Sequence, residues 1–348
     1  MGKIIEERET RVTRTYRGGK LLDAFLGKEH CEDSFFPEDW ISSFTEAKNK
    51  VYLPGEGITR TKDGRLLPEA VPVGAFGQGR TEPGVLIKLL DSAERLGIQV
   101  HPTDAYARRL FGSPWGKTEC WHILATRTIN GESPKIYLGF QPHITRTLWE
   151  EYYRRQDVSA MLAGMNEITV RPGDTVLVRG GMPHAIGAGC LLLEIQQPSD
   201  YTMRCETVPL SGEPYTPQQI HYGAGEAAML DCFDYAPQAQ GGFLLSPRKS
   251  AGDGYTRTDH VTYADTPCFA LSELSGGFSV CEPCFVTAVC LSDGGTLESE
   301  DGVFSLHRGD KYFIPADTAV SCRDCRLLLC YPPEIGYAER QKRPDAGV

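Results

Sequence analysis

The sequence lacks any long run of apolar residues. Nowhere does it approach the roughly 18 consecutive apolar residues that a membrane-spanning helix needs. Residues 1–6 carry charge where a signal peptide would have its apolar centre. The Met-Gly start is not a myristoylation signal, because Glu6 stands where Ser or Thr is required. We therefore expect a soluble, cytoplasmic protein without a membrane partner.

Three functional signatures are missing as well. No cluster of Lys and Arg is extended enough to follow a phosphate backbone, and 46 acidic against 36 basic residues give a net charge of −10, so nucleic acid is not an expected partner. The Gly-rich segments 77–79 and 187–189 do not open a helix within a βαβ unit, so no nicotinamide cofactor is indicated. No Ser or Cys has the base and oxyanion context of a catalytic nucleophile.

Length, composition and cysteines define the class of the chain. Its 348 residues, 41% of them apolar, suffice for two ordinary domains with buried cores. Without a secretory signal, the 12 cysteines are expected to be free thiols. Two Cys-x-x-Cys pairs, Cys281/Cys284 and Cys322/Cys325, are separated by more residues than in most zinc ribbons. We expect packed thiols there, with a structural zinc site as the alternative.

Short runs with strand character follow residue 85, separated by Gly, Pro, Asp and Asn, which is typical of antiparallel β structure. They lie at residues 85–90, 98–101, 121–124, 135–140, 167–170, 175–178 and 190–196. Residues 145–165 instead have helical spacing, with Thr145 as a first N-cap and Asp157 or Ser159 as a second. The fold class predicted is therefore mainly β, with a small helical insertion.

Polar residues recur at alternate positions within these apolar segments. Gln99 and His101 share one face of a strand, and Lys117 and Glu119 have the same spacing. His184 follows a Gly-Gly-Met-Pro turn, and Glu194 and Gln196 repeat the alternation. Each residue alone is more often structural, but burying the whole set is costly unless its members are paired or ligate something. Two imidazoles and a carboxylate suit zinc and similar metals and leave positions open for substrate oxygens, so we expect an enzyme.

The second half of the chain echoes the first. Residues 306–316 resemble residues 170–180, as in a duplicated β-barrel, but the copy has no histidine where His184 would fall. Residues 212–219 have the composition of a linker, and residues 1–82 are expected to wrap the first core. We predict a catalytic domain at 1–210, with its helical insertion at about 144–166, and a metal-free second domain at 211–348.

Taken together, the motifs resemble those of class I mannose-6-phosphate isomerase, a zinc-dependent enzyme of the cupin superfamily. The resemblance runs from about residue 16 to residue 204 and continues weakly beyond. It is carried by Leu89-Leu90-Asp91, Ile98-Gln99-Val100-His101-Pro102, Gly116-Lys117-Thr118-Glu119-Cys120-Trp121, Pro172-Gly173-Asp174, Pro183-His184-Ala185-Ile186-Gly187 and Glu194-Ile195-Gln196-Gln197-Pro198-Ser199-Asp200.

The resemblance implies two cupin-type jelly-roll barrels and one zinc ion per chain. It implies that the metal is held by His101, Glu119, His184 and Gln99. It places Lys117, Glu194, Asp200 and Arg204 around the sugar, and Trp40 and Ser43 near the substrate mouth. The implied reaction interconverts mannose 6-phosphate and fructose 6-phosphate. The segment around Met203 and Cys205 departs from the family pattern, so another phosphosugar or a free aldose is an alternative substrate.

Isomerisation through an enediol needs a base for a C–H proton and a cation for the developing oxyanion. Glu194 and Lys117 are both candidate bases, and the sequence does not choose between them. Arg204 and Lys88 are candidates for binding the phosphate or the enediolate. A cupin dioxygenase and a non-catalytic sugar-binding cupin are the competing functions, and the two cations favour the isomerase. A monomer or weak homodimer is expected.

Overall fold

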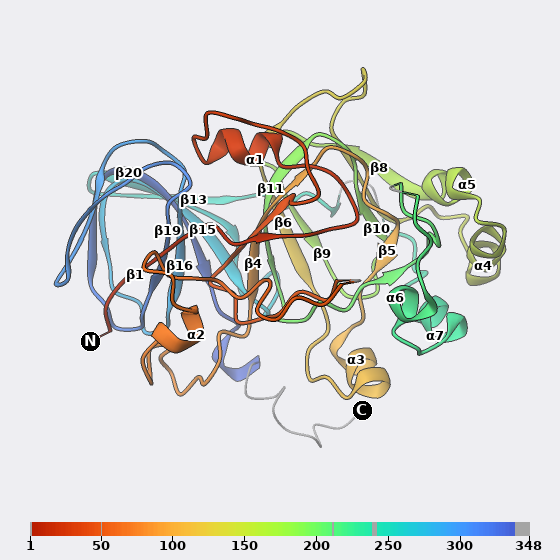
Figure 1. Cartoon of the computed structure of the whole chain (residues 1–348), viewed down its shortest axis with the longest axis horizontal. Helices are drawn as coiled ribbons and strands as arrows, with labels where there is room; N and C mark the ends of the chain where they lie inside the picture. The colour runs from red at the N-terminus through yellow and green to blue at the C-terminus, as the bar shows by residue number, and fades with distance from the viewer. Residues whose placement is uncertain (1, 50, 211, 239–241, 338–348) are drawn as a thin grey trace.

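The computed structural model describes residues 2–49, 51–210, 212–238 and 242–337. It is mainly β, as predicted, with short helices at its edges (Figure 1). All strand pairings within the described residues are antiparallel, and they form three sheets. This arrangement is consistent with a cupin-like fold. No described helix has the length and apolar content to cross a membrane.

Two of the sheets form the first half of the molecule. In sheet order, the six-stranded sheet contains β2 (Arg11–Val12), β3 (Glu38–Ile41), β4 (Leu86–Ser92), β11 (Cys190–Gln196), β6 (Glu119–Thr126) and β9 (Thr175–Val178). The five-stranded sheet contains β12 (Met203–Arg204), β5 (Gln99–Val100), β10 (His184–Ile186), β7 (Lys135–Phe140) and β8 (Met165–Thr169).

The third sheet has nine strands and lies on the left in Figure 1. Its main path runs through β1 (Ile5–Glu7), β19 (Lys311–Ile314), β16 (Val286–Cys290), β20 (Val320–Tyr331), β15 (Ala270–Val280), β14 (Tyr255–Val261) and β13 (Arg248–Gly252), and β17 (Thr296–Ser299) and β18 (Gly302–Ser305) branch from it. Strand β1 pairs with β19, so the N-terminal strand completes a sheet made from the other end of the chain.

The helices are short and lie outside the sheets (Figure 1). They are α1 (Lys20–Phe25), α2 (Leu67–Ala70), α3 (Asp104–Phe111), α4 (Arg146–Arg155), α5 (Val158–Ala163), α6 (Pro217–His221) and α7 (Glu226–Asp231). The predicted caps are confirmed: the side chains of Thr145 and Asp157 accept hydrogen bonds from the first turns of α4 and α5.

The six-stranded sheet is covered on both faces, and β11 shows how. Side chains alternate between the faces of a strand. Leu191, Leu193 and Ile195 pack in a cluster with residues of the nine-stranded sheet. Leu192 packs on the opposite face, in a cluster that includes residues of the five-stranded sheet. Glu194 shares that second face, so its carboxylate is directed toward the five-stranded sheet.

The predicted linker at residues 212–219 differs from the structure. From residue 217 the chain enters α6, where Thr216 forms a capping box with Gln219. Ile220 of α6 and Met229 of α7 pack in one cluster with Trp149 of α4. Apolar residues that lie three or four apart along this segment are what bring it onto the first half of the molecule. The passage to the nine-stranded sheet therefore comes after α7.

The similarity between residues 170–180 and 306–316 is also present in the backbone. β9 and β19 each follow a turn with a glycine at positive φ, Gly173 at 94° and Gly309 at 91°. In each turn an aspartate accepts a hydrogen bond of 2.8 Å from the backbone N–H three residues earlier. Val320, at the start of β20, stands where His184 stands at the start of β10. All 12 cysteines are free, and none of those described belongs to a potential metal-binding group.

Candidate metal centre and adjoining pocket

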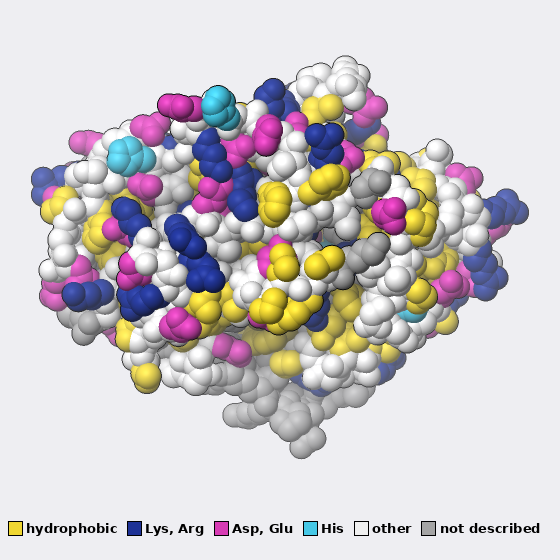
Figure 2. All heavy atoms as spheres, viewed as in Figure 1, with side chains coloured by type: hydrophobic (Ala, Val, Ile, Leu, Met, Phe, Trp, Pro, Cys, Tyr) yellow, Lys and Arg dark blue, Asp and Glu magenta, His cyan; other side chains and the backbone are white. Residues whose placement is uncertain are grey.

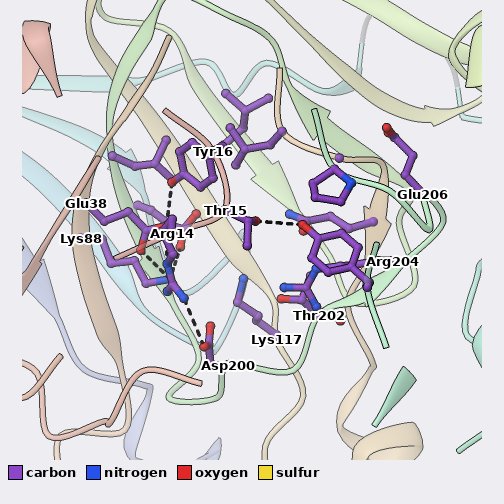
Figure 3. Close-up of a pocket in the computed structure, with 18 residues that line it drawn as sticks. Arg14, Thr15, Tyr16, Glu38, Lys88, Lys117, Asp200, Thr202, Arg204 and Glu206 are labelled. Carbon is purple, nitrogen blue, oxygen red and sulfur yellow. Dashed lines mark hydrogen bonds and ion pairs between the residues drawn. The ribbon is translucent and has the colours of Figure 1, made fainter. Parts of the chain in front are cut away.

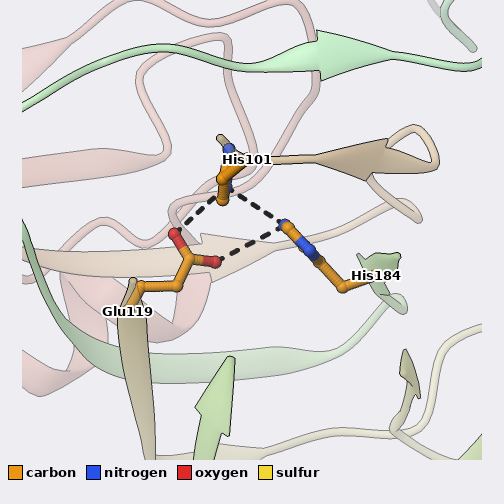
Figure 4. Close-up of side chains that lie close together, drawn as sticks. All are labelled: His101, Glu119 and His184. Carbon is orange, nitrogen blue, oxygen red and sulfur yellow. Dashed lines mark hydrogen bonds and ion pairs between the residues drawn. The ribbon is translucent and has the colours of Figure 1, made fainter. Parts of the chain in front are cut away.

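His101, Glu119 and His184 converge between the two sheets of the first half (Figure 4). His101 directly follows β5, His184 opens β10 and Glu119 opens β6. The two imidazole Nε2 atoms are 3.1 Å apart, and the Glu119 carboxylate lies 3.2 Å from His101 Nε2 and 3.5 Å from His184 Nε2. All three side chains are buried. The structure thus brings together three of the four metal ligands predicted from the sequence, and Gln99 is not part of this group.

The hydrogen bonds of the two rings fix their tautomers. Nδ1 of His101 lies 2.8 Å from the carbonyl oxygen of Tyr201, and Nδ1 of His184 lies 2.9 Å from that of Met182. A carbonyl only accepts, so each Nδ1 carries the proton and each Nε2 presents a lone pair. Two lone pairs and a carboxylate that face one another in a buried space require a cation between them. This donor set therefore fits a divalent metal such as zinc.

Lys117 is the cation closest to this group. Its ammonium donates to His101 Nε2 at 2.8 Å and to Glu119 Oε2 at 2.7 Å. Burial and, after it, the charge of the Lys117 ammonium lower the pKa of His101 to about 3. The pKa of Glu119 is held well below its usual value because Lys117 and the two imidazoles outweigh the effect of burial. Both groups therefore stay in the forms that ligate metals, a neutral imidazole and a carboxylate.

A pocket adjoins the metal-ligand group and contains Lys117 in its wall (Figure 3). Four cations line it, and so do four carboxylates. Its polar lining includes Arg14, Thr15, Tyr16, Glu38, Lys88, Gln99, Lys117, Glu194, Asp200, Thr202, Arg204, Glu206 and Tyr215. Of the predicted site residues, the pocket brings together Lys88, Gln99, Lys117, Glu194, Asp200 and Arg204.

Sheet register aligns these residues. Glu194 of β11 stands directly opposite Lys88 of β4, and the Lys88 ammonium lies 3.1 Å from Glu194 Oε1. On the facing sheet, Gln99 pairs with both His184 and Arg204. The six-stranded sheet thus supplies the Glu194–Lys88 pair. The five-stranded sheet supplies the His184 imidazole, the Gln99 amide and the Arg204 guanidinium on three neighbouring strands.

The environment of Glu194 separates it from the other carboxylates of the pocket. Burial raises its pKa above the usual value, and the charge of Glu119 adds to this effect against the opposing charge of Lys88. Asp200 has the opposite shift: despite burial, Arg14, Lys88 and Lys117 hold its pKa at about 2. A carboxylate with a raised pKa in a pocket is suited to proton transfer near neutral pH.

The N-terminal segment adds residues that the sequence analysis missed. Arg14 lies 2.9 Å from Glu38 and 3.7 Å from Asp200, and the Tyr16 hydroxyl donates to Glu38 at 2.7 Å. The charges of Arg14 and Lys88 and the hydrogen bond from Tyr16 hold the pKa of Glu38 below its usual value in spite of burial. Arg14 and Tyr16 are two residues apart after β2, a spacing that could have indicated two side chains on one face. The segment was instead predicted only to wrap the first core, so neither residue was proposed for the site.

Arg204 is held at the opposite end of the pocket. One guanidinium nitrogen donates to the carbonyl oxygens of Thr202 at 3.1 Å and Gln219 at 2.5 Å, and the group lies over the Tyr215 ring at 5.1 Å. α6 therefore contributes to the positioning of this cation.

Two predicted substrate-binding residues are not among those that line the pocket. Trp40 is fully buried and donates to Glu38 at 2.7 Å, while Arg14 and Lys88 lie over its ring at 5.1 and 4.9 Å. Trp40 therefore contacts three side chains that line the pocket but does not line it itself. Ser43 is fully buried, and its hydroxyl donates a hydrogen bond to the carbonyl oxygen of Thr45. The structure does not bring it to the site.

Sequence comparison finds similar curated proteins, whereas no protein-family model matches the chain. A probable mannose-6-phosphate isomerase of Bacillus subtilis is 38% identical over 191 residues, which are 55% of this chain and 57% of that relative. The mannose-6-phosphate isomerase ManA of the same organism is 38% identical over 124 residues, 34% of this chain and 36% of the relative. The match thus spans 57% of the length of the first relative and 36% of the length of the second.

Structure comparison extends the likeness over nearly the whole chain. The crystal structure of a mannose 6-phosphate isomerase from Bacillus subtilis matches with a TM-score of 0.74 at 23% identity, covering 94% of this chain and 99% of that one. A mutant phosphomannose isomerase from Salmonella typhimurium matches with a TM-score of 0.71 at 16% identity, covering 95% and 100%. The resemblance predicted from the motifs is confirmed, and the fold is that of these structures.

Proposed function

We propose that this chain is a mannose-6-phosphate isomerase, an enzyme that interconverts mannose 6-phosphate and fructose 6-phosphate through an enediol. The observation that carries the proposal is a buried His-Glu-His group beside a pocket that holds a carboxylate of raised pKa and several cations. The names of the similar proteins support it.

We assign the metal to His101, Glu119 and His184, with Gln99 as a candidate fourth ligand and one zinc ion per chain. When bound, the ion acts as a Lewis acid for the substrate oxygens. Because a metal at this place draws on the lone pairs that Lys117 now contacts, the ammonium is expected to turn toward the pocket. There it donates a hydrogen bond to a sugar oxygen.

Glu194 is our choice for the base. It takes the proton from C2 of the aldose and returns it to C1, while the O2 hydroxyl loses a proton and O1 gains one. The conversion is internally balanced and needs no outside oxidant. Lys88, 3.1 Å from Glu194, steadies the carboxylate, which is a positioning role and leaves Lys88 little capacity for a phosphate.

Arg204 is then the phosphate-binding cation. It lines the pocket beside Thr202, and its planar guanidinium suits a bidentate contact with phosphate (Figure 3). Asp200, ionised beside Arg14, is placed to accept hydrogen bonds from sugar hydroxyls.

We further propose that the two halves are two cupin-type barrels, with only the first retaining a metal site of this kind. The matching turns before β9 and β19 support a duplication. We propose that the boundary between the halves lies after α7 rather than at residue 210, since α6 and α7 pack with the first half. Since one chain supplies the whole pocket, a monomer or weak homodimer would be active. Buried free thiols favour a cytoplasmic location.

The test is an assay of fructose 6-phosphate formation from mannose 6-phosphate, run on purified, chelator-treated and zinc-restored protein. We expect turnover that is lost on chelation, restored by zinc and independent of O₂. His184→Gln should abolish it, and His307→Gln, a change at an exposed histidine, should not. A zinc-loaded protein that binds the sugar without converting it would support a sensor instead. Turnover that needs O₂ would support a dioxygenase.

A further inference from the structure

A second group of histidine and carboxylate side chains lies between the sheets of the two halves. His122 belongs to β6, His260 to β14 and Glu273 to β15. One ligand atom from each residue lies within 4.8 Å of the other two. Both imidazoles are buried, and their ring centroids are 4.2 Å apart. His122 points away from the pocket because its neighbours Trp121 and Ile123 occupy the other face of β6.

One hydroxyl connects the two imidazoles. Thr175 Oγ1 lies 2.9 Å from His122 Nδ1 and 3.4 Å from His260 Nδ1. A hydroxyl oxygen has two lone pairs, so it can accept hydrogen bonds from the Nδ1–H groups of both rings. In that arrangement each imidazole carries its proton on Nδ1 and presents a lone pair at Nε2.

The Nε2 atom of His260 makes no hydrogen bond in the described structure. His260 Nε2 is buried without a hydrogen bond, and the group that it faces is the Glu273 carboxylate, with Oε2 at 3.9 Å. Two acceptors facing each other in a buried space repel, and 3.9 Å is too long for a hydrogen bond. A metal cation bound between them would satisfy both groups.

Glu273 is oriented toward this space by Arg326. The guanidinium donates to Glu273 Oε1 at 3.0 and 2.8 Å, which leaves Oε2 for His260. Arg326 is half exposed and neutralises one oxygen as an outer partner of the carboxylate.

We propose that His122, His260 and Glu273 form a second metal site, which binds a divalent first-row transition ion and joins the two halves of the molecule. The donor set is again two neutral imidazoles and a carboxylate, which suits zinc. Its ligands come from the six-stranded sheet on one side and the nine-stranded sheet on the other. The role is structural, since this site lies on the face of β6 opposite the catalytic pocket.

The test is the metal content of the full chain after loading with Zn²⁺ and removal of unbound ion by gel filtration. We expect two ions per chain in the wild type and one in His260→Gln, which should keep its isomerase activity. His184→Gln should also retain one ion, and the double variant should retain none. His143→Gln, at an exposed histidine, is the matched control and should bind two.

A second readout guards against a variant that folds poorly. In the His184→Gln background, added Zn²⁺ should raise the melting temperature, and Glu273→Gln in that background should abolish the shift. Co²⁺ loaded into His184→Gln should give d–d absorption that Glu273→Gln removes. If the wild type binds one ion, lost in His184→Gln and unaffected by His260→Gln, the group holds a proton in place of a metal and the proposal is wrong.

Discussion

At the residue scale, Glu194 and Asp200 show how the same functional group is set for different tasks. Both are buried carboxylates in one pocket. The pKa of Glu194 is raised, since burial outweighs its single close cation, and that of Asp200 is lowered to about 2 by Arg14, Lys88 and Lys117. A base for C–H protons must be able to accept a proton near neutral pH, which Glu194 can do and Asp200 cannot.

Glu194→Gln should lower kcat by roughly 10²- to 10⁴-fold, the usual contribution of a general base. The pH profile of the wild type should lose activity as pH falls through the raised pKa of Glu194, because the protonated acid cannot take up the C2 proton. Kinetics with mannose 6-phosphate between pH 5 and 9 measure both effects. Zinc content should stay at the wild-type value. An unchanged kcat would assign the base to Lys117.

Arg204→Ala should act mainly on binding. If the guanidinium holds the phosphate, its loss raises KM by roughly 10-fold or more, corresponding to a charge-assisted hydrogen bond of about 1.5–3 kcal/mol. Comparison with mannose as substrate provides the control, because the variant should lose its preference for the phosphorylated sugar. Equal losses for both sugars would place the phosphate elsewhere.

At the element scale, the structure shows which parts of the chain were predictable. β7, β9 and β11 have the bounds expected from their composition, and the caps of α4 and α5 are local signals that tertiary contacts did not override. The grouping of His101, Glu119 and His184 was predictable because each of them lies in a recognisable motif. Arg14 and the His122 group were not, because they depend on which strands become neighbours, and single-sequence periodicity does not contain that information.

Thr145→Ala tests the element rather than the site. Loss of the N-cap of α4 should reduce the free energy of unfolding by about 1 kcal/mol. Thr147→Ala, inside the same helix and exposed, is the control and should be neutral or slightly stabilising. Urea denaturation measures both. Since α4 packs outside the pocket, kcat should not change, and a loss of activity would mean that the helix positions the site.

At the scale of the whole molecule, the N-terminal strand ties the halves together. Glu7 ends β1 and accepts hydrogen bonds from the backbone N–H of Ser42 at 2.8 Å and from its hydroxyl at 2.5 Å. Thr287 of the nine-stranded sheet donates to the same hydroxyl at 2.8 Å. Beside them, Lys311 is paired with Asp39. Burial raises the pKa of Glu7 to about 7.

This shift makes stability pH-dependent. The folded-state pKa of Glu7 lies above the unfolded value, so its contribution is full below about pH 4.5 and is lost as pH rises through about 7. Glu7→Gln should therefore flatten the fall in unfolding free energy between pH 5 and 8, by up to about 3 kcal/mol at 1.36 kcal/mol per pKa unit. Urea denaturation at both pH values measures it, with Glu6→Gln as the control. Parallel curves for wild type and Glu7→Gln would contradict the assignment.

The two-faced β11 strand also has a consequence for protein engineering. Leu191, Leu193 and Ile195 face the nine-stranded sheet, whereas Leu192 and Glu194 face the five-stranded sheet, and Glu194 lines the pocket. Substitutions at alternate residues of this seven-residue strand should therefore affect either the pocket or the packing between the halves. A mutational library restricted to Leu191, Leu193 and Ile195 would vary stability and leave the pocket lining unchanged. A library at Glu194 would vary the pocket and leave that packing unchanged.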